Sequence, residues 1–508
     1  MARFQSILFE RAVLVDELSE PEFFGDLNLD QVVAAVTAGR GEYDLTPFFY
    51  APLRDVAAVH YRHEVLRDLQ RDAVREPVER FASSMREMRA HLDQAGKLRY
   101  RYQKQRWFLY AVATYSAAVV ALRDRLAAVE VASRGFREFR EYLGEYVGSP
   151  RFRGLVADTR ERREDLDRIR YCVHIRGARV RISRYEDESD YSLAVSRTFA
   201  KFRQGTVKER RFTFAEPADM NHVEAQVLEG VTTLFSETFA ELTRYREQHA
   251  DFLDRPIETF DREVQFYLAW LDYGKRFTAA GLALTLPRVS TRDKRISAEE
   301  AYDLALATKV VPAEPVVCND FRLDDGERII VVTGPNQGGK TTFARMFGQL
   351  TYLASLGCPV PAIRASLFLP DRLFSHFERE ESLATLRGKL DDELVRIHDI
   401  ISRATGRSVI VMNESFASTT LNDALFIGTE VLNRIIALGS LAVYVTFVDE
   451  LASLSDTTVS MVGGVVPDDP ARRTYQIARR PADGLAYAAA IATKYGLDHD
   501  TLRRRVAR

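Results

Sequence analysis

The stretch IIVVTGPNQGGKTTFARMF, residues 329–347, joins a β-branched run to a glycine-rich turn and then to residues with helical spacing. Residues 329–332 have the continuous apolar character of a buried parallel strand. A glycine, four further residues and then Gly-Lys-Thr, at 334–341, form the pattern of a phosphate-binding loop. Glycines suit such a loop because the chain curls close around phosphate oxygens, where a side chain would collide. The order of strand, loop and helix predicts a nucleotide-binding fold rather than a merely glycine-rich turn.

The residues after the loop define the expected ligand contacts. Apolar side chains recur every three or four positions, at Phe343, Met346, Phe347, Leu350 and Leu353. The N-terminus of this predicted helix would point its partial positive charge at the phosphates of a nucleotide. Thr341 offers a hydroxyl to the Mg²⁺ ion that accompanies the nucleotide. We expect the whole loop to hold the phosphates: Gly334, Pro335, Asn336, Gln337, Gly338, Gly339, Lys340, Thr341 and Thr342.

Composition indicates a large protein without a membrane segment. The 508 residues are 46% hydrophobic, and the formal net charge of −2 shows that the molecule as a whole is not a polycation. Cys172, Cys318 and Cys358 lie far apart, which favours reduced packing thiols over disulfides or a zinc site. The N-terminus lacks a long apolar core, and the longest uncharged apolar stretch, residues 107–122, is short for a bilayer span. We expect a cytoplasmic protein.

The pattern of charged and apolar residues changes near residue 290. Before it, charged segments with helical periodicity dominate; after it, β-branched runs alternate with helices. Residues 171–185 are strand-like and rich in arginine, and residues 286–297 have the polar character of a connector. The predicted fold class is therefore multidomain, with a mainly α-helical domain followed by an α/β domain that contains the phosphate-binding loop.

A second strand of the α/β domain ends in polar residues. The segment SVIVMNES, residues 408–415, is apolar up to Asn413 and Glu414. A nucleotide hydrolase places a group on the magnesium side and a general base at this position, so Glu414 is the candidate base and Asn413 an indirect magnesium partner. Alternatively, the strand ends in polar residues only because it reaches the surface. Residues 441–447 predict a third strand, and residues 457–466 with 472–480 predict a closing β-hairpin.

Three segments together resemble the ATPase domain of the MutS family: TGPNQGGKTT at 333–342, LASLGCPVPA at 353–362 and NESFASTTLNDA at 413–424. The resemblance is strong over about residues 300–508 and weak over 40–290. It implies an ABC-type P-loop ATPase at 300–508 with C-terminal helices, and ATP and Mg²⁺ as ligands. It also implies a helical core or lever domain at 40–290, with clamp strands near 171–212, after an N-terminal segment at 1–39. The partners that it implies are DNA and a second copy of the chain in a homodimer.

The sequence also departs from the family pattern. The helical core starts too early to leave room for the family's N-terminal mismatch-recognition and connector domains. Asn413 stands where the family has aspartate, and Phe447 stands where it has a histidine that senses the γ-phosphate. In the signature segment, which should reach the partner's nucleotide, Arg387 fits and Gly388 replaces a serine. These departures predict ATP binding with slow hydrolysis.

Two basic segments are candidates for DNA contact. One is residues 97–107, whose cations and aromatic residues could equally form a solvated helix face. The other matches the family's clamp and contains Arg176, Arg179, Arg181 and Arg184, followed by Lys201 and Arg203. We expect an ATP-controlled dimeric clamp on DNA that is mismatched, branched or otherwise altered. The alternative is a nucleotide-gated scaffold with a vestigial ATPase that binds protein partners instead of DNA.

Overall fold

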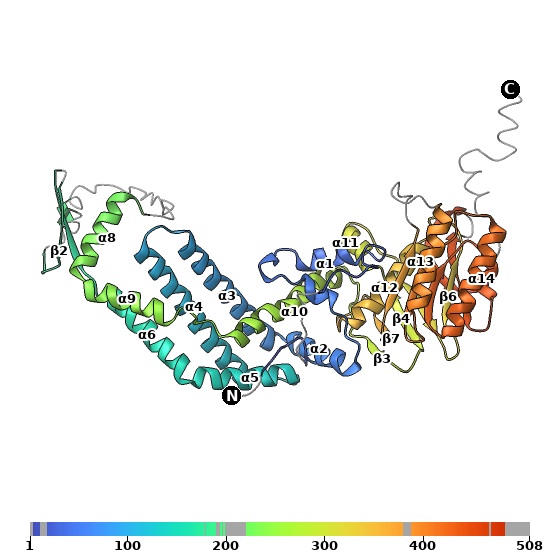
Figure 1. Ribbon diagram of the computed structural model, residues 1–508, viewed down its shortest axis with the longest axis horizontal. Helices are drawn as coiled ribbons and strands as arrows, with labels where there is room; N and C mark the ends of the chain where they lie inside the picture. The colour runs from blue at the N-terminus through green and yellow to red at the C-terminus, as the bar shows by residue number, and fades with distance from the viewer. Residues whose placement is uncertain are drawn as a thin grey trace, which may run out of the picture. The chain divides into compact units, whose positions relative to one another are not determined.

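A computed structural model describes residues 4–10, 18–177, 179–188, 194–195, 197–198, 220–378, 388–466 and 469–482 (Figure 1). The chain forms two compact units. The first comprises residues 1–4, 71–131 and 137–261, and the second comprises residues 5–70, 132–136 and 262–508. The second unit thus takes in most of the expected N-terminal segment, and the expected boundaries at 39 and 290 stay predictions.

The first unit is helical, as the amphipathic spacing predicted. Its long helices are α3 (Asp72–Lys97) and α4 (Arg101–Ala127), followed by α5 (Arg134–Gly148), α6 (Pro150–Asp167), α8 (His222–Leu234) and α9 (Ser236–Gln248). Buried apolar residues on α3 recur with helical spacing, from Val74 through Val78 and Phe81 to Met85. The rings of Phe139 and Phe260 stack 3.6 Å apart between α5 and α10 (Arg255–Ala279).

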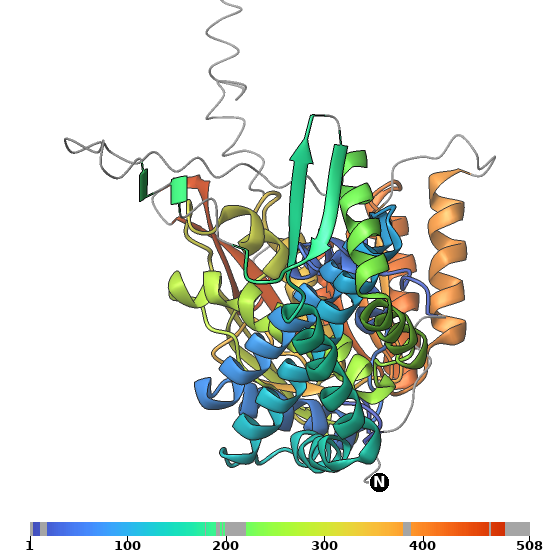
Figure 2. The same ribbon diagram turned by 90° about the vertical axis from the view of Figure 1, so that its left-hand side faces the viewer.

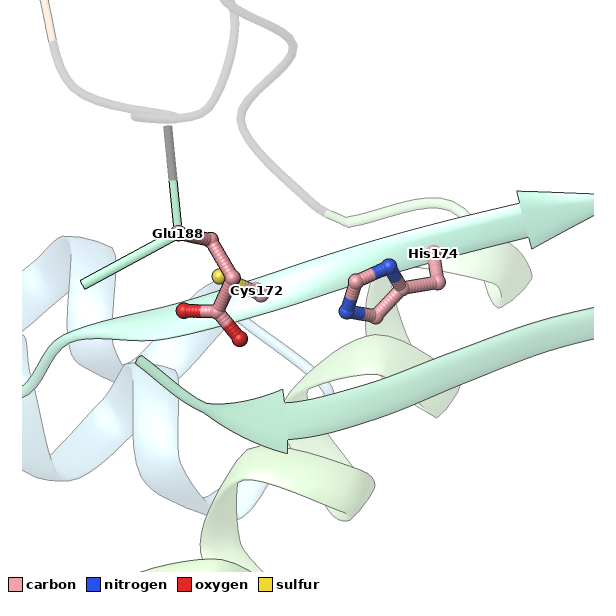
Figure 3. Close-up of side chains that lie close together, drawn as sticks. All are labelled: Cys172, His174 and Glu188. Carbon is pink, nitrogen blue, oxygen red and sulfur yellow. The ribbon is translucent and has the colours of Figure 1, made fainter. Parts of the chain in front are cut away.

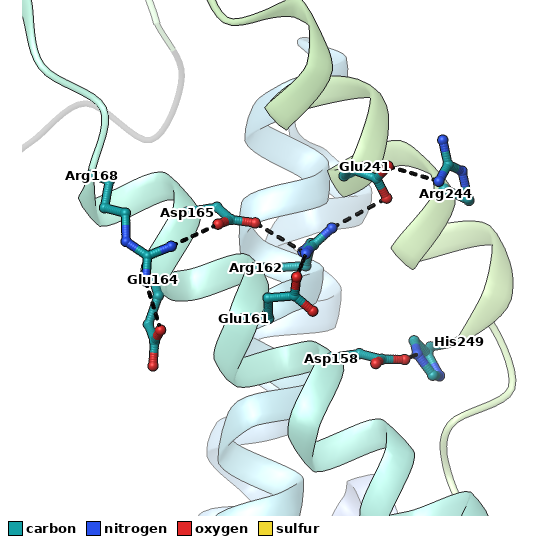
Figure 4. Close-up of polar contacts among 9 residues, drawn as sticks. All are labelled: Asp158, Glu161, Arg162, Glu164, Asp165, Arg168, Glu241, Arg244 and His249. Atoms are coloured by element: carbon teal, nitrogen blue, oxygen red, sulfur yellow. Dashed lines mark hydrogen bonds and ion pairs between the residues drawn. The ribbon is translucent and has the colours of Figure 1, made fainter.

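An ion-pair network joins α6 to α9 within this unit (Figure 4). The Arg162 guanidinium lies 2.6 Å from Glu161, 3.1 Å from Asp165 and 3.2 Å from Glu241 on α9. The side chain of Arg162 is only 11% exposed, so this network is better shielded from solvent than an ordinary surface pair. His249 makes a second link through a 2.9 Å contact with Asp158.

A two-stranded antiparallel hairpin, β1 (Tyr171–Arg176) and β2 (Arg179–Arg184), follows α6. The register pairs Cys172 with Ser183 and His174 with Arg181, and side chains of paired residues point to the same face of a hairpin. One face is therefore polar and basic. The other face is mainly apolar and β2 lies against α8 (Figure 2). Ile182 approaches Gly230 of α8 so closely that a Cβ on this glycine would be 2.5 Å from the isoleucine side chain. The predicted strand region is confirmed for the described residues.

The second unit is built on a six-stranded sheet with the order β12-β11-β6-β10-β9-β8. Neighbouring strands are parallel except at the β11–β12 pair, which is the predicted closing hairpin. Among the described residues, the helices that pack on this sheet include α12 (Lys340–Ser355), α13 (Lys389–Arg403) and α14 (Leu421–Leu438). The strands are β6 (Ile329–Thr333), β8 (Leu373–Phe377), β9 (Val409–Asn413), β10 (Leu441–Val445), β11 (Thr458–Val466) and β12 (Asp469–Arg479).

A smaller four-stranded sheet has the order β3-β7-β4-β5. Its strands are β3 (Arg288–Ser290), β4 (Ile296–Ala301), β5 (Asn319–Leu323) and β7 (Arg364–Phe368). The segment expected as a connector, residues 286–297, contains β3 and the start of β4. Their polar residues escaped the strand pattern because the strands are short and only partly buried.

The N-terminal part of the second unit packs on α12, the helix that follows the phosphate-binding loop. It contains α1 (Leu29–Thr37) and α2 (Val56–Leu69). The Gln349 amide on α12 donates to the Leu27 carbonyl at 2.9 Å and to the Asp303 carboxylate at 2.8 Å. Gly348 leaves room for Leu27, since a Cβ at this position would lie 2.6 Å from the leucine side chain. Direct packing therefore links residues 26–29 to the nucleotide-binding helix.

Two expectations meet the limits of the described residues. The C-terminal helices expected after residue 483 lie outside the described ranges. So do Lys201 and Arg203, two of the basic residues considered for DNA contact. Among the described residues, none of the helices has the length and apolar content needed to cross a bilayer.

Candidate functional site

The loop between β6 and α12 has the backbone conformation that its glycines permit. Gly334 has a φ of 112°, and a Cβ there would lie 2.8 Å from the backbone nitrogen of Gly463 on β11. A Cβ on Gly338 would lie 2.8 Å from the Pro335 carbonyl oxygen. Side chains are therefore excluded where a phosphate-binding backbone has to curl, and the loop leads directly into the N-terminus of α12.

Lys340 lies inside this loop rather than in solvent. Its ammonium donates to the Gly334 carbonyl at 2.9 Å, to the Pro335 carbonyl at 3.2 Å and to the Asn336 side-chain oxygen at 3.2 Å. Burial lowers the pKa of Lys340, while the carboxylates of Glu414 and Asp449 oppose this shift. The ammonium is thus a desolvated cation with weak neutral acceptors, which a phosphate could replace with stronger, charged ones.

Parallel strands bring the other predicted site residues to the same edge of the sheet. Val445 of β10 pairs with Val332 of β6 on one side and with Asn413 of β9 on the other. The residues that follow these three positions therefore emerge side by side at the carboxyl ends of the strands, where ligands bind in open α/β sheets. Glu414 is one of them, and its backbone N–H donates to the Val445 carbonyl at 2.9 Å.

Two polar atoms at this edge fit a bound, hydrated cation. Asn413 is buried, and its side-chain oxygen has no hydrogen-bond partner among the described residues. The Thr333 hydroxyl at the end of β6 is likewise buried without a partner in the described part of the chain. Buried polar atoms are rarely left unpaired, so these two suit the water shell that Mg²⁺ keeps when it binds a nucleotide.

The turn that carries Glu414 is held in an unusual conformation by Glu393 on α13. Glu414 and Phe416 have φ values of 51° and 66°, in the left-handed region that residues other than glycine seldom adopt. The Phe416 N–H donates to the Glu393 carboxylate at 3.0 Å, and Phe416 itself is fully buried. Burial raises the pKa of Glu393. The anchor fixes the backbone two residues beyond the candidate base.

Phe447 occupies the corresponding position after β10. Its side chain is 43% exposed. The backbone around it is held by the Thr446 N–H, which donates to the Val332 carbonyl at 3.0 Å, and by the Val448 N–H, which donates to the Thr446 hydroxyl at 3.1 Å. The position therefore borders the site, but the benzyl side chain offers no hydrogen-bond donor.

Strand β12 contributes residues that the motif search missed. Arg473 donates from Nε to the Asn336 carbonyl of the loop at 3.2 Å. Tyr475 has a φ of 60°, is 51% exposed and lies beside Gly339, where a Cβ would be 3.7 Å from its ring. The sequence feature that could have identified these residues is an aromatic residue among arginines in the predicted hairpin, RRTYQIARR at 472–480.

The signature segment is described only in part, because Arg387 lies outside the described residues. Gly388 is the N-cap residue of α13 with φ −66°, a conformation open to any amino acid. A Cβ at Gly388 would meet nothing within 4 Å among the described atoms.

The four arginines predicted to contact DNA do not act as one group. Arg176, Arg179 and Arg181 are exposed on the polar face of the hairpin. Arg184 points to the opposite face, where its guanidinium donates to the Leu234 carbonyl at 2.7 Å and lies 5.1 Å from the centre of the Phe235 ring. The register thus divides the set into three outward-facing cations and one that links β2 to the end of α8.

Comparison with known proteins identifies the α/β domain. Residues 330–476 match the family model for MutS domain V. Over 271 residues, or 51% of this chain, the sequence is 32% identical to the DNA mismatch repair protein MutS of Sorangium cellulosum. The MutS proteins of Chlorobium limicola and Psychrobacter cryohalolentis are 32% and 31% identical over 29% and 33% of the chain.

The matched segment is only part of each relative. It covers 28% of the Sorangium protein, 17% of the Chlorobium protein and 16% of the Psychrobacter protein. The α/β unit, with its phosphate-binding loop between β6 and α12, is nevertheless the part that the family model describes. The helical region followed by this α/β domain also confirms the expected fold class. Residues 330–476 are therefore similar to MutS domain V, an ATPase domain of the ABC type.

Proposed function

We propose that this protein is an ATP-dependent switch that binds DNA as a homodimer and hydrolyses ATP slowly. One observation carries the proposal: β6, β9 and β10 bring the phosphate-binding loop, Glu414 and Phe447 to one edge of a MutS domain V sheet. Gly334 and Gly338 allow the tight curl of the loop, because a Cβ at either position would collide with neighbouring backbone. Lys340 would exchange its carbonyl partners for the phosphates of ATP.

Glu414 is the proposed general base. A carboxylate there would accept the proton from a water molecule that attacks the γ-phosphate, and the anchored turn would hold it in place. Mg²⁺, held through Thr341 and through water on Asn413, would neutralise charge that develops on the phosphate oxygens. Tyr475 and Arg473 lie against the loop on β12, which makes them candidate contacts for the nucleotide.

Asn413 and Phe447 are the reasons to propose slow turnover. Asparagine keeps the shape of aspartate but lacks its charge, so it should hold the hydrated Mg²⁺ less tightly. Phenylalanine cannot donate a hydrogen bond to the γ-phosphate. Loss of a single donor to a developing anion costs roughly 2 to 4 kcal/mol of barrier, by analogy with oxyanion holes. ATP-bound molecules would therefore persist, as a long-lived switch requires.

The hairpin is the proposed DNA contact. Arg176, Arg179 and Arg181 present three exposed cations on one face, where they could contact phosphates of a nucleic-acid backbone. Arg184 is excluded from this set because its guanidinium is engaged with α8. The relatives named DNA mismatch repair proteins make altered DNA, mismatched or branched, the substrate class to test first.

Gel shifts on duplex and branched DNA at increasing salt would test this proposal, with and without ATP and Mg²⁺. Each lost phosphate contact should make the negative slope of log affinity against log salt shallower by about 0.9. Replacement of Arg176, Arg179 and Arg181 by glutamine should therefore flatten the slope by up to about 3 units. A matched control replaces Arg160, Arg163 and Arg168, which are exposed cations of α6 and its C-terminal end.

The two candidate functions predict different results. DNA binding that depends on salt and is lost in the hairpin variant would support the clamp. An ATP-dependent dimer that binds neither duplex nor branched DNA would instead favour the scaffold with a vestigial ATPase. If the salt dependence of DNA affinity became shallower by the same amount in the α6 control variant, the assignment of DNA contact to the hairpin would be contradicted.

A further inference from the structure

A cysteine, a histidine and a glutamate lie together on the polar face of the hairpin (Figure 3). Cys172 and His174 come from β1, and Glu188 comes from the segment after β2. The ligand-capable atoms of the three side chains all lie within 4.8 Å of one another, and none of the three residues is buried. We propose that Cys172, His174 and Glu188 bind a divalent transition-metal ion, with Zn²⁺ as the best match.

The hairpin itself positions two of the three ligands. Cys172 and His174 are two residues apart on one strand, so their side chains point to the same face. The chain then turns and returns along β2, and after Arg184 it brings Glu188 back beside Cys172. The observed pairing of β1 with β2 thus already brings together three ligands from two separate segments.

The donor set fits zinc in its chemistry and its spacing. Thiolate, imidazole and carboxylate are the three side-chain ligand types that Zn²⁺ uses, and metal–ligand distances of 2.0 to 2.3 Å place tetrahedral ligands roughly 3.3 to 3.8 Å apart. The side chains thus need to close by only about 1 Å. Side chains that are exposed or half-buried can make this adjustment by rotation, without movement of the strands. A thiolate in the set also argues against Mg²⁺ or Ca²⁺, which prefer oxygen ligands.

Charge also favours the assignment. A thiolate and a carboxylate balance the two positive charges of the ion, so the loaded site is neutral beside Arg181, which pairs with His174 across the hairpin. Metal binding would release one proton per chain, because the thiolate rather than the thiol is the ligand. The three protein ligands leave a fourth position for water.

The wide spacing of Cys172, Cys318 and Cys358 disfavours a zinc site built from several cysteines, but a site with one cysteine does not depend on that spacing. The hairpin supplies the other ligands from different residue types. Because the site shares a face with Arg176, Arg179 and Arg181, a bound ion would fix Glu188 on the face that carries these arginines. The metal would then stabilise the geometry of the basic face.

Cobalt substitution tests the site directly, in full-length protein without a histidine tag after removal of metal by a chelator. Added Co²⁺ should give a thiolate-to-cobalt charge-transfer band that saturates at one ion per chain. Cys172→Ser should abolish this band. Zn²⁺ affinity, measured by competition with a chromophoric chelator, should fall at least about 10-fold in His174→Ala and in Glu188→Gln, since even loss of an outer-shell partner has effects of that size.

Cys318→Ser is the matched control, because Cys318 is the other half-buried free thiol. This variant should keep the band and the Zn²⁺ affinity of the parent. Circular dichroism and nucleotide binding of each variant would show that the fold is intact, since the ligands lie far in sequence from the ATPase domain. Absence of a charge-transfer band in the parent, or its persistence in Cys172→Ser, would overturn the proposal.

Discussion

Replacement of Glu263 by glutamine should change the pH dependence of stability in the second unit. Glu263 lies on α10 and is 7% exposed. Its carboxylate accepts hydrogen bonds from the Ser6 hydroxyl and the Ile7 N–H, each at 2.8 Å. The Ser6 hydroxyl oxygen in turn accepts from the Phe9 N–H at 2.8 Å. A single buried carboxyl group thus organises residues 6–9.

The sign and size of the effect follow from the pKa of this group. Burial raises the pKa of Glu263 from 4.5 to about 7, against the opposing effect of its hydrogen bonds. The folded state therefore holds a proton that the unfolded state releases. Its stabilising contribution is complete below about pH 4.5 and is lost as the pH rises through about 7. A difference of about 2.5 pKa units corresponds to about 3 kcal/mol of unfolding free energy.

Urea denaturation between about pH 5 and 8 would measure this difference. The chain has two tryptophans, and Trp270 is buried on α10 in the same unit. In a Trp107→Phe background, Trp270 fluorescence would report unfolding of the second unit alone. Glutamine cannot ionise, so stability of Glu263→Gln relative to the parent should rise by about 3 kcal/mol across this range.

Other groups titrate in the same range, so only the difference between variants is informative. Burial lowers the pKa of His63 to about 4, and its contribution to stability is therefore lost as the pH falls below 6.5. His63 is present in both proteins and cancels in the comparison. Glu430→Gln, which changes an exposed glutamate on α14, is the control and should follow the parent. Parallel profiles for the parent and Glu263→Gln would refute the reasoning.

The remaining predictions concern the nucleotide site. Lys340→Ala should weaken ATP binding about 10- to 100-fold through loss of a charge-assisted contact, and a filter assay that shows parental affinity would contradict the assignment of the loop. In single-turnover assays, the double variant Asn413→Asp with Phe447→His should hydrolyse ATP about 30- to 1000-fold faster than the parent, whereas Glu414→Gln should nearly abolish hydrolysis. A parent that already turns over at tens per second, within the usual enzyme range of about 1 to 1000 per second, would count against the slow switch. Gly388→Ser should raise the melting temperature slightly, because serine is a better N-cap than glycine by a few tenths of a kcal/mol and its Cβ enters open space; a lower melting temperature would show that the position is constrained.

Local motifs predicted the centre of the site because the relevant physics is local. A phosphate-binding loop needs its glycines within a few residues, and an apolar strand that ends in Asn413 and Glu414 marks its own carboxyl end. The parallel order of β6, β10 and β9 then follows from the α/β pattern. For these elements, sequence and structure agree within one or two residues.

Contacts between distant segments could not be predicted in this way. Arg473 and Tyr475 reach the loop only because β12 pairs with β11, which lies next to β6. The contact of Glu393 with the Phe416 backbone depends on how α13 packs against the sheet. Likewise, the hairpin register rather than the arginine count separates Arg184 from the other three.

The bond between Glu393 and the Phe416 N–H has a consequence for communication between subunits. The same helix, α13, begins at the candidate signature segment and holds the turn that carries Glu414. In a homodimer whose signature segments cover each other's nucleotides, ATP in one subunit would bias the position of the base in the other. Thermodynamic linkage makes any such effect on ATP affinity reciprocal, and the first and second ATP molecules would then bind with different affinities. The dimer would then have three distinct states, with no ATP, one ATP or two ATP molecules bound.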